Sequence, residues 1–388
     1  MKRSLAAVAA ATLSLALLAG CGSGSSGSSD SDAIKLGVNY ELSGPVATYG
    51  DASVQGIELA VEEINAAGGI DGKPIEIIKY DTKSEPAEAT TLATKLMTQD
   101  DVITVIGPAT SGSFKATIPV ANQNHVPVVS GSATAEDVTV SNGQVQEYAF
   151  RTCFSDSFQG TAMANFAAKD LGAKTAVIIK DTSSDYAKGL AENFASTFKA
   201  DGGTIVGEEG YVAGDTDFNA ILTSIRSKDF DVIYLPGYYN EVGLIIKQAR
   251  ALGITAPILG GDGYESPTLL QLAGASALND VYYTDHYSPL DTENVKVTEF
   301  IENFKKKYNS EPSAFSALGY DTAYFVADAI SRSGAELTGD AVKDAMASTT
   351  DFQGVTGNFG IDANHDPEKA ALVIGLTDGV PTSAVKAA

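Results

Sequence analysis

Cysteine is nearly absent from this sequence, because its 388 residues include only two. Two thiols cannot build a disulfide framework or a four-thiolate metal site. Basic residues are also few, with 26 Lys and Arg against 49 Asp and Glu and a formal net charge of −23. Nucleic acid is therefore not an expected partner, since phosphate binding relies on clustered Lys and Arg. The acidic balance also argues against a polybasic dock on anionic lipid.

Catalytic signatures are missing as well. There is no G-x-S-x-G elbow, P-loop, C-x-x-C or H-E-x-x-H motif, and the three histidines (His125, His286 and His365) form no recognisable triad or metal spacing. We predict no enzyme, no metal and no cofactor. The mean hydropathy of +0.01 excludes a polytopic membrane protein. A soluble chain of one large or two smaller domains remains, at about 100–200 residues per domain.

The N-terminus indicates export. Lys2 and Arg3 precede an apolar stretch, 5–18, that is too short to span a bilayer comfortably. It ends in Leu18-Ala19-Gly20-Cys21, which resembles a bacterial lipobox. We predict a signal peptide over 1–20, a lipidated Cys21 and a Gly/Ser tether over 21–32; an ordinary secretory peptide is the alternative. The tether contains a G-x-G-x-x-G match, but no strand precedes it and no helix follows, so it is not a dinucleotide site.

From residue 33 onward, short apolar runs alternate with helical patterns. Strands are predicted at 34–38, 74–80, 102–106, 127–130, 176–180, 204–206, 232–235 and 257–259. Helices are predicted at 54–64, 88–97, 114–122, 161–171, 187–200, 218–227 and 241–252. This repetition indicates parallel sheets covered by helices, and the number of units favours two doubly wound α/β domains. In such sheets ligands bind at the carboxyl ends of the strands.

Hydroxyl-rich turns follow two of these strands. Ser111 lies after 102–106, and Thr134 lies after 127–130. Helix N-termini there would suit a carboxylate, although simple capping is the alternative, since Thr134 and Asp137 match the [ST]-x-x-[DE] box. In the second half, Tyr186 and Tyr238 could line an apolar pocket. Asp262, flanked by glycines, is either an exposed turn residue or a counter-charge for an ammonium group.

Three segments then carry a family resemblance. Ser43-Gly-Pro-x-Ala-x-Tyr49-Gly50, Glu63-Ile-Asn-Ala-x-Gly-Gly69-Ile and Gly237-Tyr238-x-x-Glu-x-Gly243 resemble the leucine/isoleucine/valine-binding proteins. These are the extracytoplasmic receptors of branched-chain amino acid ABC importers. The resemblance runs from about residue 33 to the C-terminus. It implies a type I periplasmic binding protein fold, in which two lobes joined by three crossovers clamp the ligand by hinge closure.

The resemblance also implies residue roles. Ser111 and Thr134 would hold the ligand α-carboxylate, and the Ser132 carbonyl with Asp262 would hold the α-ammonium. The residues expected around the ligand side chain are aromatic: Tyr49, Tyr186, Tyr238 and Phe315. The lobes would comprise 33–152 with 284–360, and 153–283 with 361–388, the last including a returning strand at 371–376. Membrane permease subunits would be the partners of an extracytoplasmic, membrane-anchored monomer. An amide, urea or another small carboxylate as ligand, or a sensory role, is the alternative.

The sequence also departs from the family. Asp262 stands where the leucine-type receptors commonly carry Glu, which is one methylene longer. Ser84 and Thr110 occupy the positions of a disulfide found in some members, so that disulfide is absent, and Thr110 adds a hydroxyl beside the pocket. We predict that Cys153 is a small buried apolar residue near the first crossover, and that His286 packs in the hinge near the second.

Overall fold

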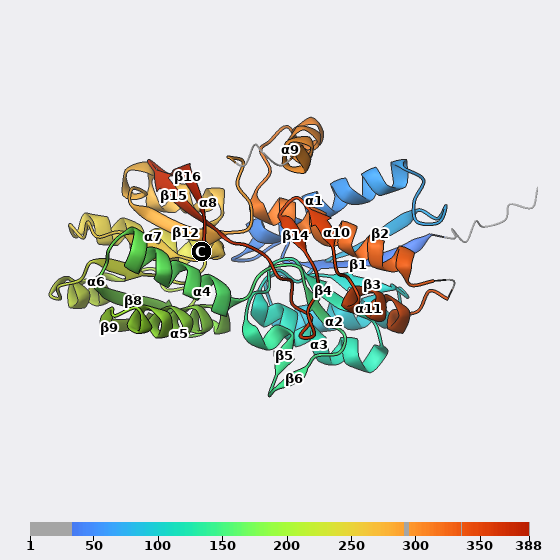
Figure 1. Cartoon of the computed structure of the whole chain (residues 1–388), viewed down its shortest axis with the longest axis horizontal. Coiled ribbons are helices and arrows are strands. Elements are labelled where there is room, and N and C mark those ends of the chain that lie inside the picture. The colour runs from blue at the N-terminus through green and yellow to red at the C-terminus, as the bar shows by residue number, and fades with distance from the viewer. Residues whose placement is uncertain (1–32, 291–294, 335, 388) are drawn as a thin grey trace, which may run out of the picture. The chain divides into compact units, whose positions relative to one another are not determined.

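The computed structural model of the chain describes residues 33–290, 295–334 and 336–387 (Figure 1). The predicted signal peptide, the lipidation site Cys21 and the tether over 21–32 lie outside these residues. Within the described ranges, no helix combines the length and the apolar character needed to cross a bilayer.

The first sheet is parallel, with the strand order β2-β1-β3-β4-β7. Its strands are β1 (Ile34–Tyr40), β2 (Ile75–Asp81), β3 (Thr104–Ile106), β4 (Val128–Ser130) and β7 (Ala149–Arg151). The helices that connect the first four of these strands are α1 (Ala47–Ala66), α2 (Pro86–Thr98) and α3 (Ser111–Asn124). The central strands are buried on both faces, as expected for a parallel sheet that helices cover.

The second sheet has the order β16-β15-β12-β11-β10-β8-β9. Its strands are β8 (Thr175–Asp181), β9 (Thr204–Tyr211), β10 (Val232–Tyr234), β11 (Ile258–Gly260), β12 (Val281–Asp285), β15 (Leu372–Thr377) and β16 (Val380–Lys386). Its helices are α4 (Asp156–Asn165), α5 (Asp185–Ala200), α6 (Asn219–Arg226), α7 (Tyr239–Ala251) and α8 (Pro267–Ala273). The two doubly wound sheets confirm the predicted fold class.

Helix α10 (Ala314–Arg332) returns the chain to the first sheet and packs along α1. Two glycines permit this close approach. A Cβ on Gly56 would lie 1.9 Å from the Ser316 carbonyl oxygen, and one on Gly319 would lie 2.1 Å from that of Ser53. A side chain at either position would therefore push the helices apart. The neighbouring helices are α9 (Val295–Tyr308) and α11 (Gly339–Ala347).

The remaining elements are short. They are β5 (Val140–Ser141), β6 (Gln144–Val145), β13 (Phe352–Gly354), β14 (Gly357–Phe359) and the helical turns Glu136–Val138, Phe166–Asp170, Asp262–Tyr264 and Ala275–Ala277.

Buried polar contacts tie together the segments that run between the sheets. Lys369, in the segment between β14 and β15, donates to the carbonyl of Thr152 at 2.9 Å. Arg151, at the end of β7, is fully buried and its Nε lies 2.7 Å from the Asp366 carboxylate. Cys153 follows in the same segment and is buried, as predicted, and burial raises the pKa of its thiol to about 12. The lobe boundaries given above remain a prediction.

The structure differs from the sequence prediction at several places. Strands β5, β6, β7 and β12 and helices α8 to α11 were not predicted. The second sheet is not wholly parallel, because β15 pairs antiparallel with β12, and β16 pairs antiparallel with β15. β16 was not predicted, although its turn has a clear signal: Asp378 and Gly379 both have positive φ, as a two-residue Asp-Gly hairpin requires. Helix α4 begins at Asp156 rather than near 161, because the Ser155 hydroxyl caps it by accepting from the Phe158 amide.

Candidate functional site

Most of the predicted ligand-binding residues meet in one small cavity at the carboxyl ends of the two sheets. Seven of the eight line it, namely Tyr49, Ser111, Ser132, Tyr186, Tyr238, Asp262 and Phe315. Ala109, Thr110 and Gly263 complete the lining. The cavity measures about 10 Å³, which is room for about one water molecule. The side chains are therefore already packed closely against one another.

The loops after β1, β3 and β4 form the first half-site, which carries Tyr49, Ser111, Ser132 and Thr134. Ser111 begins α3, and its hydroxyl accepts from the Ala135 amide at 3.1 Å. The Ser132 hydroxyl donates to the Ala109 carbonyl at 3.0 Å. The first turn of a helix leaves backbone N–H groups without intrahelical partners, so the start of α3 presents donors suited to an anion.

Thr134 does not line the cavity. It is fully buried, and its carbonyl accepts from the Asp156 amide and from Arg151 Nη1, each at 2.8 Å. Its hydroxyl has no hydrogen-bond partner among the described residues. The alternative for Thr134, a capping box with Asp137, does not form either, because the turn that follows begins after Ala135 and has no side-chain cap. The Thr134 hydroxyl still acts on the buried Asp156 carboxyl, because its contact offsets part of the rise that burial causes in the pKa of Asp156.

Glu41 supports the first half-site from behind and was not predicted. It follows β1, is fully buried, and accepts hydrogen bonds from the amides of Ala109 and Thr110 at 2.9 and 3.1 Å. The Thr110 hydroxyl donates to it as well, at 2.8 Å. Burial raises the pKa of Glu41, and these three bonds offset part of the rise. A glutamate directly after an apolar strand was the sequence signal for this role.

The loops after β8, β10 and β11 form the second half-site, with Tyr186, Tyr238 and Asp262. Asp262 is only 4% exposed, which excludes the exposed-turn interpretation. The Tyr186 hydroxyl donates to its Oδ1 at 2.7 Å, and Gln159 Nε2 donates to the same atom at 3.3 Å. Its Oδ2 lies 3.4 Å from His286 Nε2. Gln159 and His286 were not predicted as site residues.

Aromatic rings link the two half-sites. Phe315 stacks on Tyr49 with 4.3 Å between centroids, and Tyr186 stacks on Tyr238 at 5.1 Å. Tyr49 and Tyr238 meet edge to face at 5.8 Å. Burial raises the pKa of Tyr186 well above its usual value, so its hydroxyl stays protonated and remains a donor. The four rings give the cavity an apolar wall with polar tips.

Direct hydrogen bonds also join the two half-sites. The Tyr49 hydroxyl donates to the Gly263 carbonyl at 2.5 Å, and the Tyr239 hydroxyl donates to the Pro45 carbonyl at 2.8 Å. A hollow of about 620 Å³ adjoins the cavity, because Thr110 and Tyr238 line both. Loops of both sheets line this hollow.

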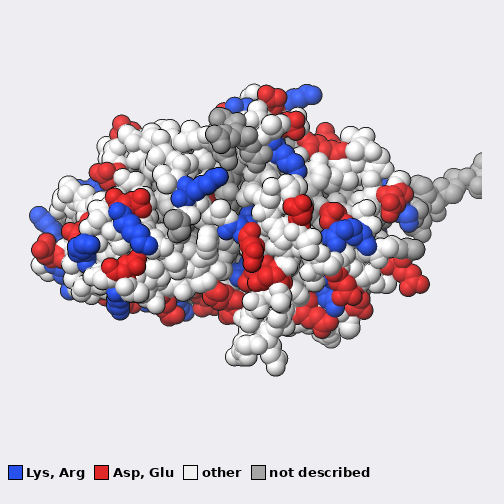
Figure 2. Space-filling model, viewed as in Figure 1, with Lys and Arg blue, Asp and Glu red and all other residues white. Residues whose placement is uncertain are grey.

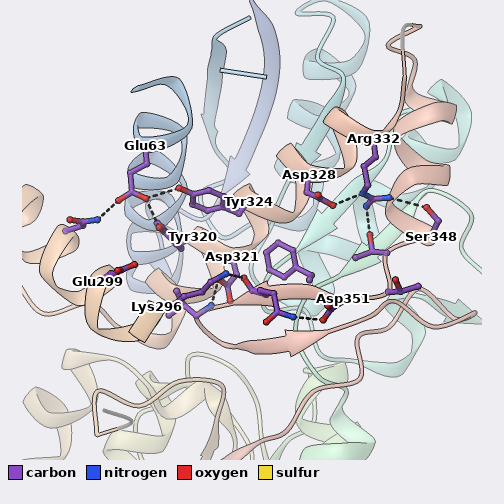
Figure 3. Close-up of a pocket in the computed structure, with 16 residues that line it drawn as sticks. Glu63, Lys296, Glu299, Tyr320, Asp321, Tyr324, Asp328, Arg332, Ser348 and Asp351 are labelled. Atoms are coloured by element: carbon purple, nitrogen blue, oxygen red, sulfur yellow. Dashed lines mark hydrogen bonds and ion pairs between the residues drawn. The ribbon is translucent and has the colours of Figure 1, made fainter. Parts of the chain in front are cut away.

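A second large hollow, of about 640 Å³, lies away from these loops, among α1, α9 and α10 (Figure 3). Its side chains bond mainly to one another. Glu63 accepts from the hydroxyls of Tyr320 and Tyr324 at 2.6 and 2.9 Å, and Arg332 pairs with Asp328 at 2.8 Å. We regard it as a surface hollow with satisfied walls, despite its size.

Surface charge does not single out a site. On the face shown in Figure 2, acidic and basic side chains are interspersed. Among the described residues, no group of three or more His, Cys, Asp or Glu is placed to hold a metal ion.

Comparison with known proteins gives one consistent family. The family model described as "Periplasmic binding protein" matches residues 33–379. The leucine-, isoleucine-, valine-, threonine- and alanine-binding protein of Pseudomonas aeruginosa is 31% identical over 86% of this chain and 87% of its own length.

Two solved structures agree with this assignment. The branched-chain amino acid transporter substrate-binding protein LivJ of Streptococcus pneumoniae, in complex with isoleucine, is 45% identical with a TM-score of 0.86, over 91% of this chain and 99% of that one. The leucine-binding protein LivK of Thermotoga maritima is 35% identical with a TM-score of 0.85, over 91% and 98%. The fold, the site at the strand ends and these similarities lead to one conclusion: the chain belongs to the periplasmic binding protein family.

Proposed function

We propose that this chain is the substrate-binding component of an ABC importer and binds a branched-chain amino acid, Leu, Ile or Val, between its two lobes. The observation that carries the proposal is the cavity itself. Hydroxyl and amide donors form one side, the buried Asp262 carboxylate forms the other, and four aromatic rings lie between them. A zwitterion with an apolar side chain needs this combination.

The relatives support the ligand class. The Streptococcus protein holds isoleucine, the Thermotoga protein is named for leucine, and the Pseudomonas protein is named for aliphatic amino acids and threonine. In this chain Ser111 and Thr134 would hold the ligand carboxylate, and Asp262 with the Ser132 carbonyl would hold the ammonium group. Tyr49, Tyr186, Tyr238 and Phe315 would surround the side chain.

The mechanism is a population shift. A ligand that contacts both half-sites stabilises the arrangement in which they are in contact, by its differential affinity for that arrangement. Membrane permease subunits would recognise this form and accept the amino acid, while other chains hydrolyse ATP. The protein itself turns nothing over.

Anchoring to the membrane completes the proposal. Cys21 follows Leu18-Ala19-Gly20, and its lipidation would hold an extracytoplasmic monomer at the membrane near the permease. Two or three acyl chains on one residue exceed what stable anchoring requires. Mass spectrometry of the mature N-terminus tests this, because an unmodified N-terminus beyond Cys21 would exclude the anchor.

The decisive test of the function is thermal unfolding of the protein against the twenty amino acids, urea and short amides. A ligand at 100 times its dissociation constant adds about 2.7 kcal/mol of stability. We expect the largest rise in Tm with Leu, Ile or Val. A rise with other amino acids alone would keep the zwitterion site and change the specificity, whereas a rise with urea or amides alone would contradict the assignment of Asp262.

A further inference from the structure

His286 is held rigidly between two of the segments that join the sheets. It directly follows β12, its side chain is 1% exposed, and its ring stacks on Phe154 with 3.5 Å between centroids and 16° between planes. Phe154 lies between β7 and α4, so the stack joins two segments that are far apart in the sequence. It also fixes the plane in which the imidazole nitrogens lie.

The ring nitrogens of His286 have unequal surroundings. Nε2 lies 3.4 Å from Asp262 Oδ2, whereas Nδ1 is buried without a partner among the described residues. A carboxylate only accepts hydrogen bonds, so Nε2 carries the proton in this contact. Burial lowers the pKa of His286 to about 4, and the imidazole is therefore a neutral donor near pH 7.

An imidazole at this place needs an explanation. A phenyl ring would stack on Phe154 equally well and would avoid burying an unpaired nitrogen, which costs free energy. The contact that a phenyl ring would lose is the one with Asp262. Tyr186 and Gln159 both donate to Oδ1 of that carboxylate, and among the described residues His286 is the donor placed at Oδ2.

We propose that His286 is a positioning residue for ligand binding, which holds Oδ2 of Asp262 in the orientation that meets the ligand ammonium group. The inference rests on the proposed function, because it takes Asp262 to be the ammonium anchor. Without the His286 donor, the carboxylate can rotate about the bonds that Tyr186 and Gln159 make to Oδ1. The ammonium group then loses a fixed partner, while the carboxylate side of the site is unchanged.

The test compares three variants of the full-length chain, purified in detergent, by isothermal titration with leucine. His286→Phe keeps the stack and removes the donor, and we expect it to weaken binding roughly tenfold, the scale of one hydrogen bond to a charged group. His286→Gln can place an amide N–H where Nε2 lies and should stay within about threefold of the unaltered protein. His286→Asn is one methylene shorter and should resemble His286→Phe.

Tyr287→Phe is the matched control. The neighbouring Tyr287 hydroxyl is buried without a partner among the described residues, so its removal should leave leucine affinity unchanged. Equal affinity for His286→Gln and His286→Asn would overturn the proposal, even if His286→Phe fails to fold.

A double-mutant cycle separates positioning from general hinge packing. If His286 acts through Asp262, His286→Phe has little further effect in an Asp262→Asn background, whereas a packing defect weakens binding equally in both backgrounds. Equal weakening overturns the proposal. If the unaltered protein binds no amino acid, the proposed function itself fails; if it binds and the cycle is additive, only the role of His286 fails.

Discussion

The two half-sites are suited to ligand groups of opposite charge, and they use different chemical groups to bind them. The first half-site offers neutral hydroxyls and the amides at the start of α3, and its charged residue, Glu41, is turned away to hold the loop after β3. The second half-site presents a charge directly, the Asp262 carboxylate. Dipoles suffice for an anion because a helix start already concentrates N–H donors. For the ammonium group the backbone offers only the Ser132 carbonyl, and the buried Asp262 carboxylate supplies the opposite charge.

The difference in chemistry predicts a difference in sensitivity. Loss of one neutral donor among several leaves the remaining donors to hold an anion. Loss of the single carboxylate leaves a buried ammonium group without a counter-charge, which costs far more. Substitution of Asp262 should therefore have a larger effect than substitution of any neutral group.

Asp262→Ala should have the largest effect. We expect leucine affinity to fall about 30-fold or more, since truncating one partner of a buried charge pair costs about 2–5 kcal/mol. Asp262→Asn keeps the shape and should lose nearly as much, because the charge is what the ammonium group requires. Isothermal titration measures both variants. Affinity within a fewfold of the unaltered protein in both would show that the anchor lies elsewhere.

Glu41→Gln tests the support behind the first half-site through stability. The amide replaces one acceptor oxygen by a donor that faces other donors, so the free energy of unfolding should fall by about 1–3 kcal/mol. The pKa of Glu41 is raised in the folded protein, so the folded state binds its proton more tightly than the unfolded state. The difference in free energy of unfolding between the unaltered protein and the variant should therefore be greatest in acid. It should shrink as the pH rises above about 4.3, the usual glutamate pKa.

Chemical denaturation of both proteins across this pH range provides the measurement. A stability difference between the two proteins that grows with rising pH would contradict the raised pKa of Glu41. Other buried carboxyl groups, such as Glu265, also have raised pKa values, but both proteins carry them, so their contributions cancel in the comparison.

Thr134→Val tests whether the residue that does not line the cavity still belongs to the site. Its hydroxyl meets no partner at hydrogen-bond geometry among the described residues but favours the ionised Asp156 carboxyl, so an isosteric replacement should leave stability unchanged or slightly lower it. If the hydroxyl donates to the ligand carboxylate, leucine affinity falls roughly tenfold, about 1.4 kcal/mol. Unchanged affinity would restrict the first half-site to Ser111, Ser132 and Tyr49.

Much of the fold could be predicted from the sequence because the patterns that indicate strands, helices and turns are local. Short apolar runs and helical periodicity locate β1 to β4 and β8 to β11 within a few residues, and turns after strands direct attention to the loops that form the cavity. The Asp-Gly turn before β16 is an equally local signal, with positive φ at both residues. The direction of β15 could not be read in the same way, since a six-residue strand does not show whether its partner runs parallel or antiparallel.

The site was predicted less completely, because its supporting residues act through contacts distant in sequence. Asp262 is separated from Gln159 by 103 positions and from His286 by 24. Nothing in either local sequence indicates a contact with a carboxylate. The family resemblance supplied residues expected to touch a ligand, whereas residues that orient those groups, such as Glu41 and His286, emerge only from three-dimensional distances.

Tyr49→Phe should have the smallest effect and bears on the contact between the half-sites. The variant keeps the stack on Phe315 and removes only the bond from the Tyr49 hydroxyl to the Gly263 carbonyl. One neutral hydrogen bond contributes about 0.5–1.5 kcal/mol, so leucine affinity should fall about two- to tenfold by isothermal titration. Tyr239→Phe, which removes the bond to the Pro45 carbonyl outside the cavity, should act through the same population shift and to a similar extent. If leucine affinity falls in Tyr49→Phe but not in Tyr239→Phe, the Tyr49 hydroxyl contacts the ligand instead. The aromatic wall would then also select ligands through a polar group.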